Sequence, residues 1–99
     1  MKLPSHCKSI EEIRDAIDLI DREIIALLGE RYRYVKEVVR FKEPTEESIV
    51  AKDRFDSVIE SRRKFAIMEE LDPDIIEKIY RDLMNHFISE EKKLIGNKE

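Results

Sequence analysis

Apolar residues recur in alternating steps of three and four along the first part of the chain, which is the spacing of a helix packed along one face. Arg31 stands in this seam where a leucine would be expected, and Arg14 and Lys42 lie in the column directly beside it. The seam comprises Ile10, Ile13, Ile17, Ile20, Ile24, Leu27, Arg31, Tyr34, Val38 and Phe41. The pattern predicts a helix over residues 10–42 with three cations on its packing side.

Capping signals mark the limits of this helix and of a second one. Ser9 followed by Glu12 is a capping-box pattern that starts the first helix, and a Glu-Pro-Thr sequence ends it. Thr45 or Ser48 can cap the next helix. We predict this second helix over about residues 46–70.

A third helix begins after Asp72, whose side chain can cap a helix that has Pro73 at its first position. This helix is predicted over residues 73–95, and one acid, Glu91, interrupts its apolar stripe. The stripe comprises Ile76, Ile79, Tyr80, Leu83, Phe87, Glu91, Leu94 and Ile95. The sequence thus predicts an all-α fold of three helices, the first one long, in a single domain of residues 1–99.

Composition narrows the functional classes. With 42% charged residues, two glycines and three prolines among 99 residues, the chain is typical of helical proteins rather than of disordered or β-rich ones. A net charge of −4 argues against a nucleic-acid partner, which needs a basic surface. No apolar run approaches the roughly 18 residues of a membrane span, and the N-terminus lacks a signal-peptide core, so we expect no membrane contact and a cytoplasmic location.

The length of the first helix predicts an assembly. About 33 helical residues span roughly 50 Å, whereas a compact chain of this size has a radius of gyration of about 13 Å. The seam is apolar along its whole length, so the two shorter helices of one chain cannot cover it. A second copy running alongside would cover it, and we predict an intertwined homodimer.

The same geometry separates the cations. Arg31 and Lys42 are eleven residues apart, so they project from one side of the helix about 16 Å from each other and can close on a small ligand. Arg14 lies about 25 Å from Arg31 along the axis, so it can join that ligand only from a partner subunit. The simpler alternative is that Arg31 pairs with an acid of another helix, while Arg14 and Lys42 extend into solvent.

A pocket walled by Arg14 of one subunit and by Arg31, Lys42 and Arg54 of the other suits a small dicarboxylate, because guanidinium groups bind carboxylates through paired hydrogen bonds. No nucleophile and base occur at a recognisable spacing, and there is neither a glycine-rich phosphate loop nor a metal-ligand set. Such a site favours a reaction that depends on positioning and electrostatic stabilisation.

Several short motifs extend this pattern over nearly the whole chain. They lie at Met1, Lys2, Pro4, Cys7, Ile13, Arg14, Ala16, Ile17, Asp18, Ile20, Asp21, Arg31, Tyr34, Val35, Lys36, Arg40, Phe41, Lys42, Arg54, Leu71, Asp72, Phe87 and Ile88. In these motifs the chain resembles the all-helical chorismate mutases, and more closely the isochorismate-pyruvate lyases of salicylate and siderophore biosynthesis. The resemblance implies a homodimer with two sites, each able to work without a cofactor.

The resemblance also implies roles for residues. Arg14 of one subunit would join Arg31, Lys42 and Arg54 of the other, with the arginines of the long helix on the substrate carboxylates. Lys42 would hydrogen-bond the ether oxygen of the enolpyruvyl group, and Lys42, Glu91 and Arg31 are the residues implied in catalysis. The other walls of the site would be Val35, Phe55, Val58, Phe87 and Ile88.

Two positions favour the lyase over the mutase. Bacterial mutases of this class usually carry acids that contact the substrate where this chain has Ala51 and Phe55. We expect conversion of isochorismate to salicylate and pyruvate by a pericyclic hydrogen transfer, with secondary chorismate mutase activity and a lid over residues 43–50. The alternatives are chorismate mutase as the main activity, a noncatalytic helical dimer that binds a partner helix or metabolite, and a plain dimerisation module.

Glu91 departs from the family pattern. Most relatives have a glutamine there, which donates a hydrogen bond to the ether oxygen. A protonated Glu91 could donate the same bond, and some eukaryotic mutases use a glutamate at this place. The other interpretation is that Glu91 pairs with Arg54 or Lys42.

Overall fold

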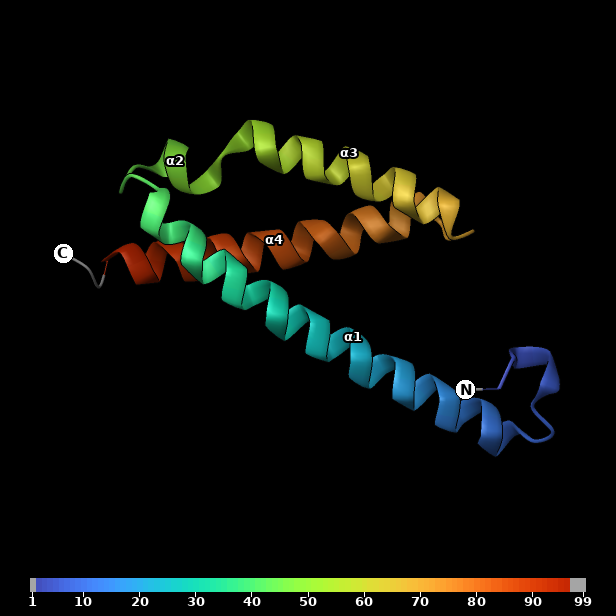
Figure 1. The fold of residues 1–99 in the computed structure, drawn as a ribbon. Coiled ribbons are helices and arrows are strands. Elements are labelled where there is room, and N and C mark those ends of the chain that lie inside the picture. Colours follow the sequence, from blue (N-terminus) through green and yellow to red (C-terminus); the bar gives the residue numbers. More distant parts are fainter. Residues whose placement is uncertain (1, 97–99) are drawn as a thin grey trace. The chain divides into compact units, whose positions relative to one another are not determined.

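The computed structural model describes residues 2–96, which form helices joined by short connections (Figure 1). No strand occurs in this part of the chain, so the predicted all-α class with a long first helix is confirmed. The elements are η1 (Pro4–His6), α1 (Ile10–Val38), η2 (Val39–Phe41), α2 (Glu46–Val50), α3 (Lys52–Met68) and α4 (Pro73–Gly96). The contacts divide the chain into a first unit that ends at Tyr34 and a second that begins at Val35. That residues 1–99 form one domain stays a prediction.

The first unit holds η1 and most of α1, whose start is capped as the sequence predicts. The Ser9 hydroxyl accepts a hydrogen bond from the Glu12 backbone N–H at 3.1 Å. The Glu12 carboxylate accepts from the backbone N–H of Lys8 at 2.8 Å, not from Ser9, and it also pairs with Lys2 at 3.1 Å. The bond from Lys8, followed by that from Lys2, lowers the pKa of Glu12. An ionised carboxylate thus lies at the positive end of the helix dipole.

The apolar seam of α1 lies at the surface. None of the residues of this helix is buried, and the apolar seam residues of the first unit are each at least 43% exposed. They are Ile10, Ile13, Ile17, Ile20, Ile24, Leu27 and Tyr34. Single exposed apolar residues are ordinary, but a continuous stripe of this length marks an interaction surface.

The second unit is built on α3 and α4, which run antiparallel side by side (Figure 1). α2 and η2 pack against α4 as well. Val39 of η2, Ile49 of α2 and Ile95 of α4 are buried together, with Ile88 and Leu94 partly buried against them. A small apolar core therefore fixes the segment after α1 onto the C-terminal half of α4.

Ion pairs tie the other end of the α3 and α4 pair. The Arg63 guanidinium donates to Asp74 at 2.9 Å and to Glu77 at 2.8 Å, and Arg81 donates to Glu77 at 2.7 Å. The bond from Arg81 lowers the pKa of Glu77, and the bond to Asp74 raises the pKa of Arg63. Asp72 accepts from the Asp74 backbone N–H at 2.9 Å, so the predicted cap of the third helix is confirmed.

The predicted second helix over residues 46–70 is wrong in its continuity, because it is divided at Ala51. Thr45 caps α2 by accepting from the Ser48 backbone N–H at 3.2 Å, and α2 ends after five residues. Ala51 then takes the left-handed conformation, with φ 47° and ψ 63°, and α3 starts at Lys52. Left-handed backbone is typical of helix C-terminal caps, but it favours glycine, so an alanine gave no signal for the break.

Replacing Ala51 with glycine is expected to raise the free energy of unfolding by about 1 kcal/mol, because glycine adopts the left-handed conformation without a steric cost. Urea denaturation at fixed protein concentration measures the change. The matched control is Ala26→Gly in α1, where the backbone is helical and the same substitution should lower stability by about 1 kcal/mol. Equal losses in both variants would contradict the left-handed assignment at Ala51.

Candidate active site

Lys42 is at the centre of the candidate site. It follows η2 directly, and its backbone N–H donates to the Val39 carbonyl at 3.3 Å. The ammonium Nζ donates to the Glu91 carboxylate Oε2 at 2.8 Å and to the Ile49 backbone carbonyl at 2.7 Å. One side chain therefore joins the end of η2, α2 and α4.

This ion pair is buried. The side chains of Lys42 and Glu91 are 16% and 7% exposed. Glu91 is the one charged residue among residues 2–96 that is buried. A carboxylate removed from water is costly unless a cation or hydrogen-bond donors meet it, and Lys42 supplies both. Of the two interpretations of Glu91, the structure agrees with pairing, and the partner is Lys42.

The ammonium of Lys42 retains hydrogen-bonding capacity. A protonated lysine has three N–H donors. Two of them are directed to acceptors of the described chain, Glu91 and Ile49, which leaves one N–H for a further acceptor. A substrate oxygen placed there would meet an oriented cation rather than a flexible one.

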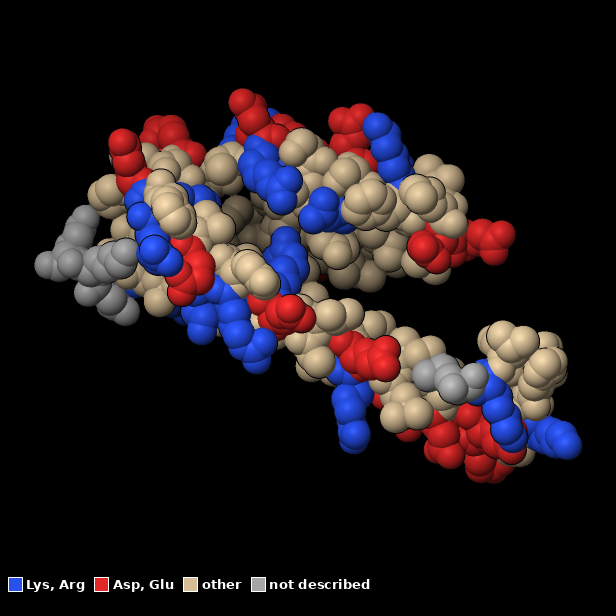
Figure 2. Space-filling model, viewed as in Figure 1, with Lys and Arg blue, Asp and Glu red and all other residues tan. Residues whose placement is uncertain are grey.

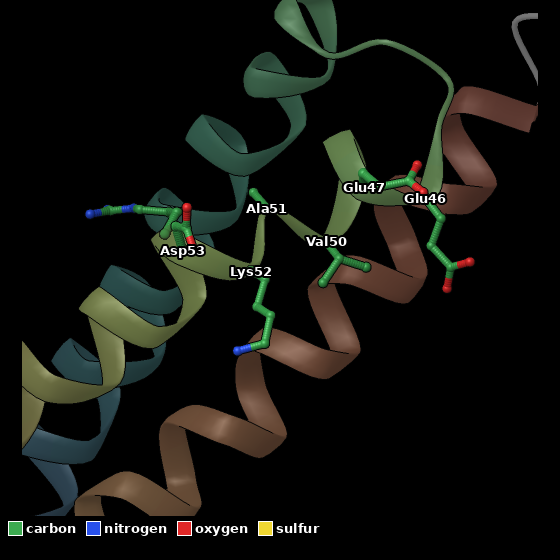
Figure 3. Close-up of a pocket in the computed structure, with 7 residues that line it drawn as sticks. Glu46, Glu47, Val50, Ala51, Lys52 and Asp53 are labelled. Carbon is green, nitrogen blue, oxygen red and sulfur yellow. The ribbon is translucent and has the colours of Figure 1, made fainter.

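Arg54 lies at the start of α3 and is exposed. Within the described chain no acid pairs with its guanidinium, so this side chain remains able to meet an anion. It borders a cavity of about 560 Å³ between α2 and the first turn of α3 (Figure 3). The lining residues are Glu46, Glu47, Val50, Ala51, Lys52, Asp53 and Arg54. Three carboxylates in that lining make this cavity itself unsuited to a dianion.

The predicted apolar walls are distributed over several surfaces of the second unit. Val58 is buried in α3, whereas Val35 and Phe87 are half-buried. Phe55 and Ile88 line a cavity of about 590 Å³ formed by α2, α3 and α4. There the Arg81 guanidinium lies 5.7 Å from the centre of the Phe55 ring, within the range of a cation–π contact.

The two candidate arginines of the long helix, Arg14 and Arg31, belong to the first unit. Arg14 is exposed and Arg31 is half-buried. The second unit thus brings Lys42 and Glu91 together by itself. Whether Arg14 and Arg31 bind substrate stays a prediction.

Sequence reasoning missed one member of the site, the backbone carbonyl of Ile49. A carbonyl carries no signal of its own in a sequence. The signal that could have found it is the end of α2, because the last carbonyls of a helix lack partners within the helix.

The surface charge agrees with a local site rather than an extended one. On the face shown in Figure 2, basic and acidic side chains are interspersed and form no continuous field of one sign.

No group of three histidine, cysteine, aspartate or glutamate side chains in residues 2–96 is placed to hold a metal ion. None of the described helices combines the length and apolar character needed to cross a membrane.

Residues 13–92 match the family described as chorismate mutase type II. The matched segment is most of the chain and contains every candidate residue from Arg14 to Glu91. The chain belongs to the type II chorismate mutase family. The all-α fold and the buried Lys42–Glu91 pair are therefore features of a member of that family.

Curated relatives of this type II chorismate mutase chain carry two kinds of name. The isochorismate pyruvate lyase of Pseudomonas aeruginosa is 36% identical over 93 residues, which cover 94% of this chain and 91% of the relative. The T-protein of Enterobacter agglomerans is 34% identical over 79 residues, and that of Haemophilus influenzae is 28% identical over 89 residues. The matches cover 80% and 90% of this chain but only 21% and 24% of the two T-proteins.

Replacing Lys42 with methionine is expected to lower the free energy of unfolding by about 3 kcal/mol, because it leaves the Glu91 carboxylate buried without a partner. Urea denaturation measures this loss. The double variant Lys42→Met with Glu91→Leu should recover most of it, since no unpaired charge then remains. Lys52→Met, which removes an exposed pair with Asp56, is the control and should stay near wild type. A double variant less stable than the single one would contradict this account.

Proposed function

We propose that this protein is an isochorismate-pyruvate lyase, which converts isochorismate to salicylate and pyruvate. The observation that carries the proposal is the 36% identity to the Pseudomonas aeruginosa isochorismate pyruvate lyase, with nearly all of both chains aligned. The oriented Lys42 ammonium adds chemical support, because it is a cation suited to an ether oxygen. A cytoplasmic location is part of the proposal.

The active form in this proposal is a homodimer. The exposed apolar seam of α1 in the first unit supports it, since that stripe needs a partner of matching length and a second copy of α1 supplies one. The site then takes the partner subunit's Arg14 together with Arg31, Lys42 and Arg54 of one chain. The two carboxylates of the substrate would be bound by these arginines.

The reaction in this proposal needs no cofactor. The bond between the ring carbon and the ether oxygen breaks while a ring hydrogen moves to the methylene carbon of the enolpyruvyl group. The ring becomes that of salicylate, and the departing fragment becomes pyruvate. Negative charge grows on the ether oxygen as its bond breaks, and the remaining N–H of Lys42 stabilises it there. Arg31 holds the carboxylate close to the reacting bond, Glu91 borders Lys42, and Val35, Phe55, Val58, Phe87 and Ile88 exclude water.

Chorismate mutase activity is the second candidate, and the family match favours it. The same cations would hold chorismate and stabilise its rearrangement to prephenate. Ala51 and Phe55 weigh against it as the main activity, because neither offers the acid that related bacterial mutases usually carry at these positions. We therefore place the mutase reaction second, and a noncatalytic dimer third.

Purified protein mixed with isochorismate is expected to release salicylate and pyruvate in equal amounts without added metal or nucleotide. Salicylate fluorescence and an enzymatic assay for pyruvate follow the two products. Chorismate offered separately should give prephenate at a lower kcat/KM. Prephenate formation that exceeds salicylate formation would make the mutase the main activity, and absence of both products would leave a noncatalytic dimer.

Variants of α1 provide the control for this assay. Arg31→Leu should lower kcat/KM by about 100-fold or more, because it removes a charged donor to a substrate carboxylate. Arg22→Leu makes the same change at an exposed position on the solvent side of the same helix and should leave activity near wild type. If Arg31→Leu instead keeps its activity and gains stability, Arg31 is a packing position of a dimerisation module.

Sharing of the site between subunits is tested by complementation. Arg14→Leu and Arg31→Leu homodimers should each be inactive, because each lacks one arginine in both sites. After subunit exchange, half of the dimers are mixed and each has one intact site, so about a quarter of wild-type activity should return. Exchange confirmed by mass spectrometry with no return of activity would show that Arg14 and Arg31 do not act across subunits.

A further inference from the structure

The segment between Lys42 and Ala51 returns to its own starting point. It leaves η2 at Lys42, forms α2, and brings the Ile49 carbonyl back to 2.7 Å from the Lys42 ammonium. The Glu43 backbone N–H donates to the Ser48 hydroxyl at 3.1 Å across the same turn. The segment is therefore a closed loop, and Lys42 is at its closure.

The acceptor in this closure exists because the helix is broken. In a continuous helix the Ile49 carbonyl would accept from the N–H four residues later. α2 ends at Val50, and Ala51 turns left-handed, so the Ile49 carbonyl is one of the last four of its helix. The Lys42 ammonium satisfies it. The strained backbone at Ala51 and the contact at Ile49 are thus two parts of one arrangement.

The side chain of Ile49 anchors the segment of residues 43–51 in the apolar core. Its side chain is buried with Val39 and Ile95, while its carbonyl faces Lys42. Glu91 lies one turn before Ile95 on α4 and receives the same ammonium. The Ile49 side chain therefore packs directly on α4, and the Ile49 carbonyl is linked to α4 through Lys42.

We propose that Lys42, Glu91 and the Ile49 carbonyl form a latch that keeps residues 43–51 folded on α4 before any substrate binds. Glu91 is its positioning residue, because it acts through Lys42. All contacts of the latch are made within the chain, so none of them needs a ligand. Its meaning for turnover rests on the proposed lyase function, in which Lys42 meets the ether oxygen.

The carboxylate of Glu91 determines the strength of the latch. A hydrogen bond between an ammonium and a carboxylate is about twice as strong as one to a neutral group, and burial increases the difference. A glutamine at this position would offer Lys42 only an amide oxygen. Glu91 therefore makes closure of the loop independent of substrate.

A loop that is already closed should increase the affinity for substrate. If the loop were open for part of the time, the apparent affinity would fall in proportion to the fraction of the protein that is closed, and the latch avoids this loss. Lys42 keeps one N–H for the ligand while the other two hold it in place. Loss of Glu91 should thus raise KM more than it lowers kcat, since the ammonium itself remains.

Hydrogen exchange of the ligand-free protein tests the latch with Glu91→Gln. The reporters are the amides of Ile49, bonded to Thr45 at 3.0 Å, and of Ala51, bonded to Glu47 at 2.9 Å. Both should exchange about tenfold faster in the variant, because opening of the loop becomes more frequent. The amide of Glu69 at the far end of α3 is the reference and should not change.

Glu90→Gln is the matched control. It removes the same charge from the neighbouring residue of α4, where the carboxylate pairs with Lys93 at 3.3 Å near the surface. Its Ile49 and Ala51 amides should exchange as in wild type. Lys42→Met, which removes the ammonium, should speed exchange at the same two amides at least as much as Glu91→Gln.

Three results would overturn the latch. They are equal exchange in Glu91→Gln and wild type, an equal rise in Glu90→Gln, and a rise at Glu69 as large as at Ile49, which would mean loosening of the whole unit.

Kinetics then test the positioning role, with KM in Glu91→Gln expected to rise about tenfold at nearly constant kcat. If no substrate is turned over at all, the proposed function fails, while the exchange data still decide on the latch.

Discussion

The buried carboxylate of Glu91 is the constraint on which the second unit depends. A carboxylate that is 7% exposed must be met by a cation, and Lys42 meets it at 2.8 Å. Lys42 is 49 residues away in sequence, so this one contact fixes where the chain returns after η2. The net gain in stability from such a pair is modest, because desolvation offsets most of the attraction. Its structural consequence is that the end of η2, α2 and α4 meet at one ammonium group.

The pairing also determines which charges remain for a ligand. Lys42 and Glu91 together are neutral, so on the proposed function the two carboxylates of the substrate depend on arginines. Arg54 has no acid partner within the described chain, and Arg14 is exposed. Lys42 then contributes to catalysis through the orientation of its N–H donors, which Glu91 and the Ile49 carbonyl fix, and not through net charge. Such a division suits a reaction in which charge develops on one oxygen between two bound carboxylates.

Local chemistry made much of the fold predictable from the sequence. Ser9, Thr45 and Asp72 each accept the backbone hydrogen bond expected of a cap, and the helix starts follow from them. The break at Ala51 could not be predicted in the same way, because alanine is the strongest helix former and rarely adopts the left-handed conformation seen there. Glu91 was recognised as an acid in an apolar stripe, but the stripe alone left its partner open between Lys42 and Arg54.

The candidate site was less predictable than the fold, because its geometry uses groups without sequence signatures. The Ile49 carbonyl is the example: any residue supplies one, and its importance arises only where α2 ends beneath Lys42. The seam of α1 differs from the Ile49 carbonyl, because its isoleucines can be recognised in the sequence. In the structure these isoleucines are exposed. A continuous apolar face at the surface is typical of an interaction surface. The side-chain pattern of the sequence thus specifies the helices, whereas the orientation of the Lys42 ammonium depends on where the backbone turns at Ala51.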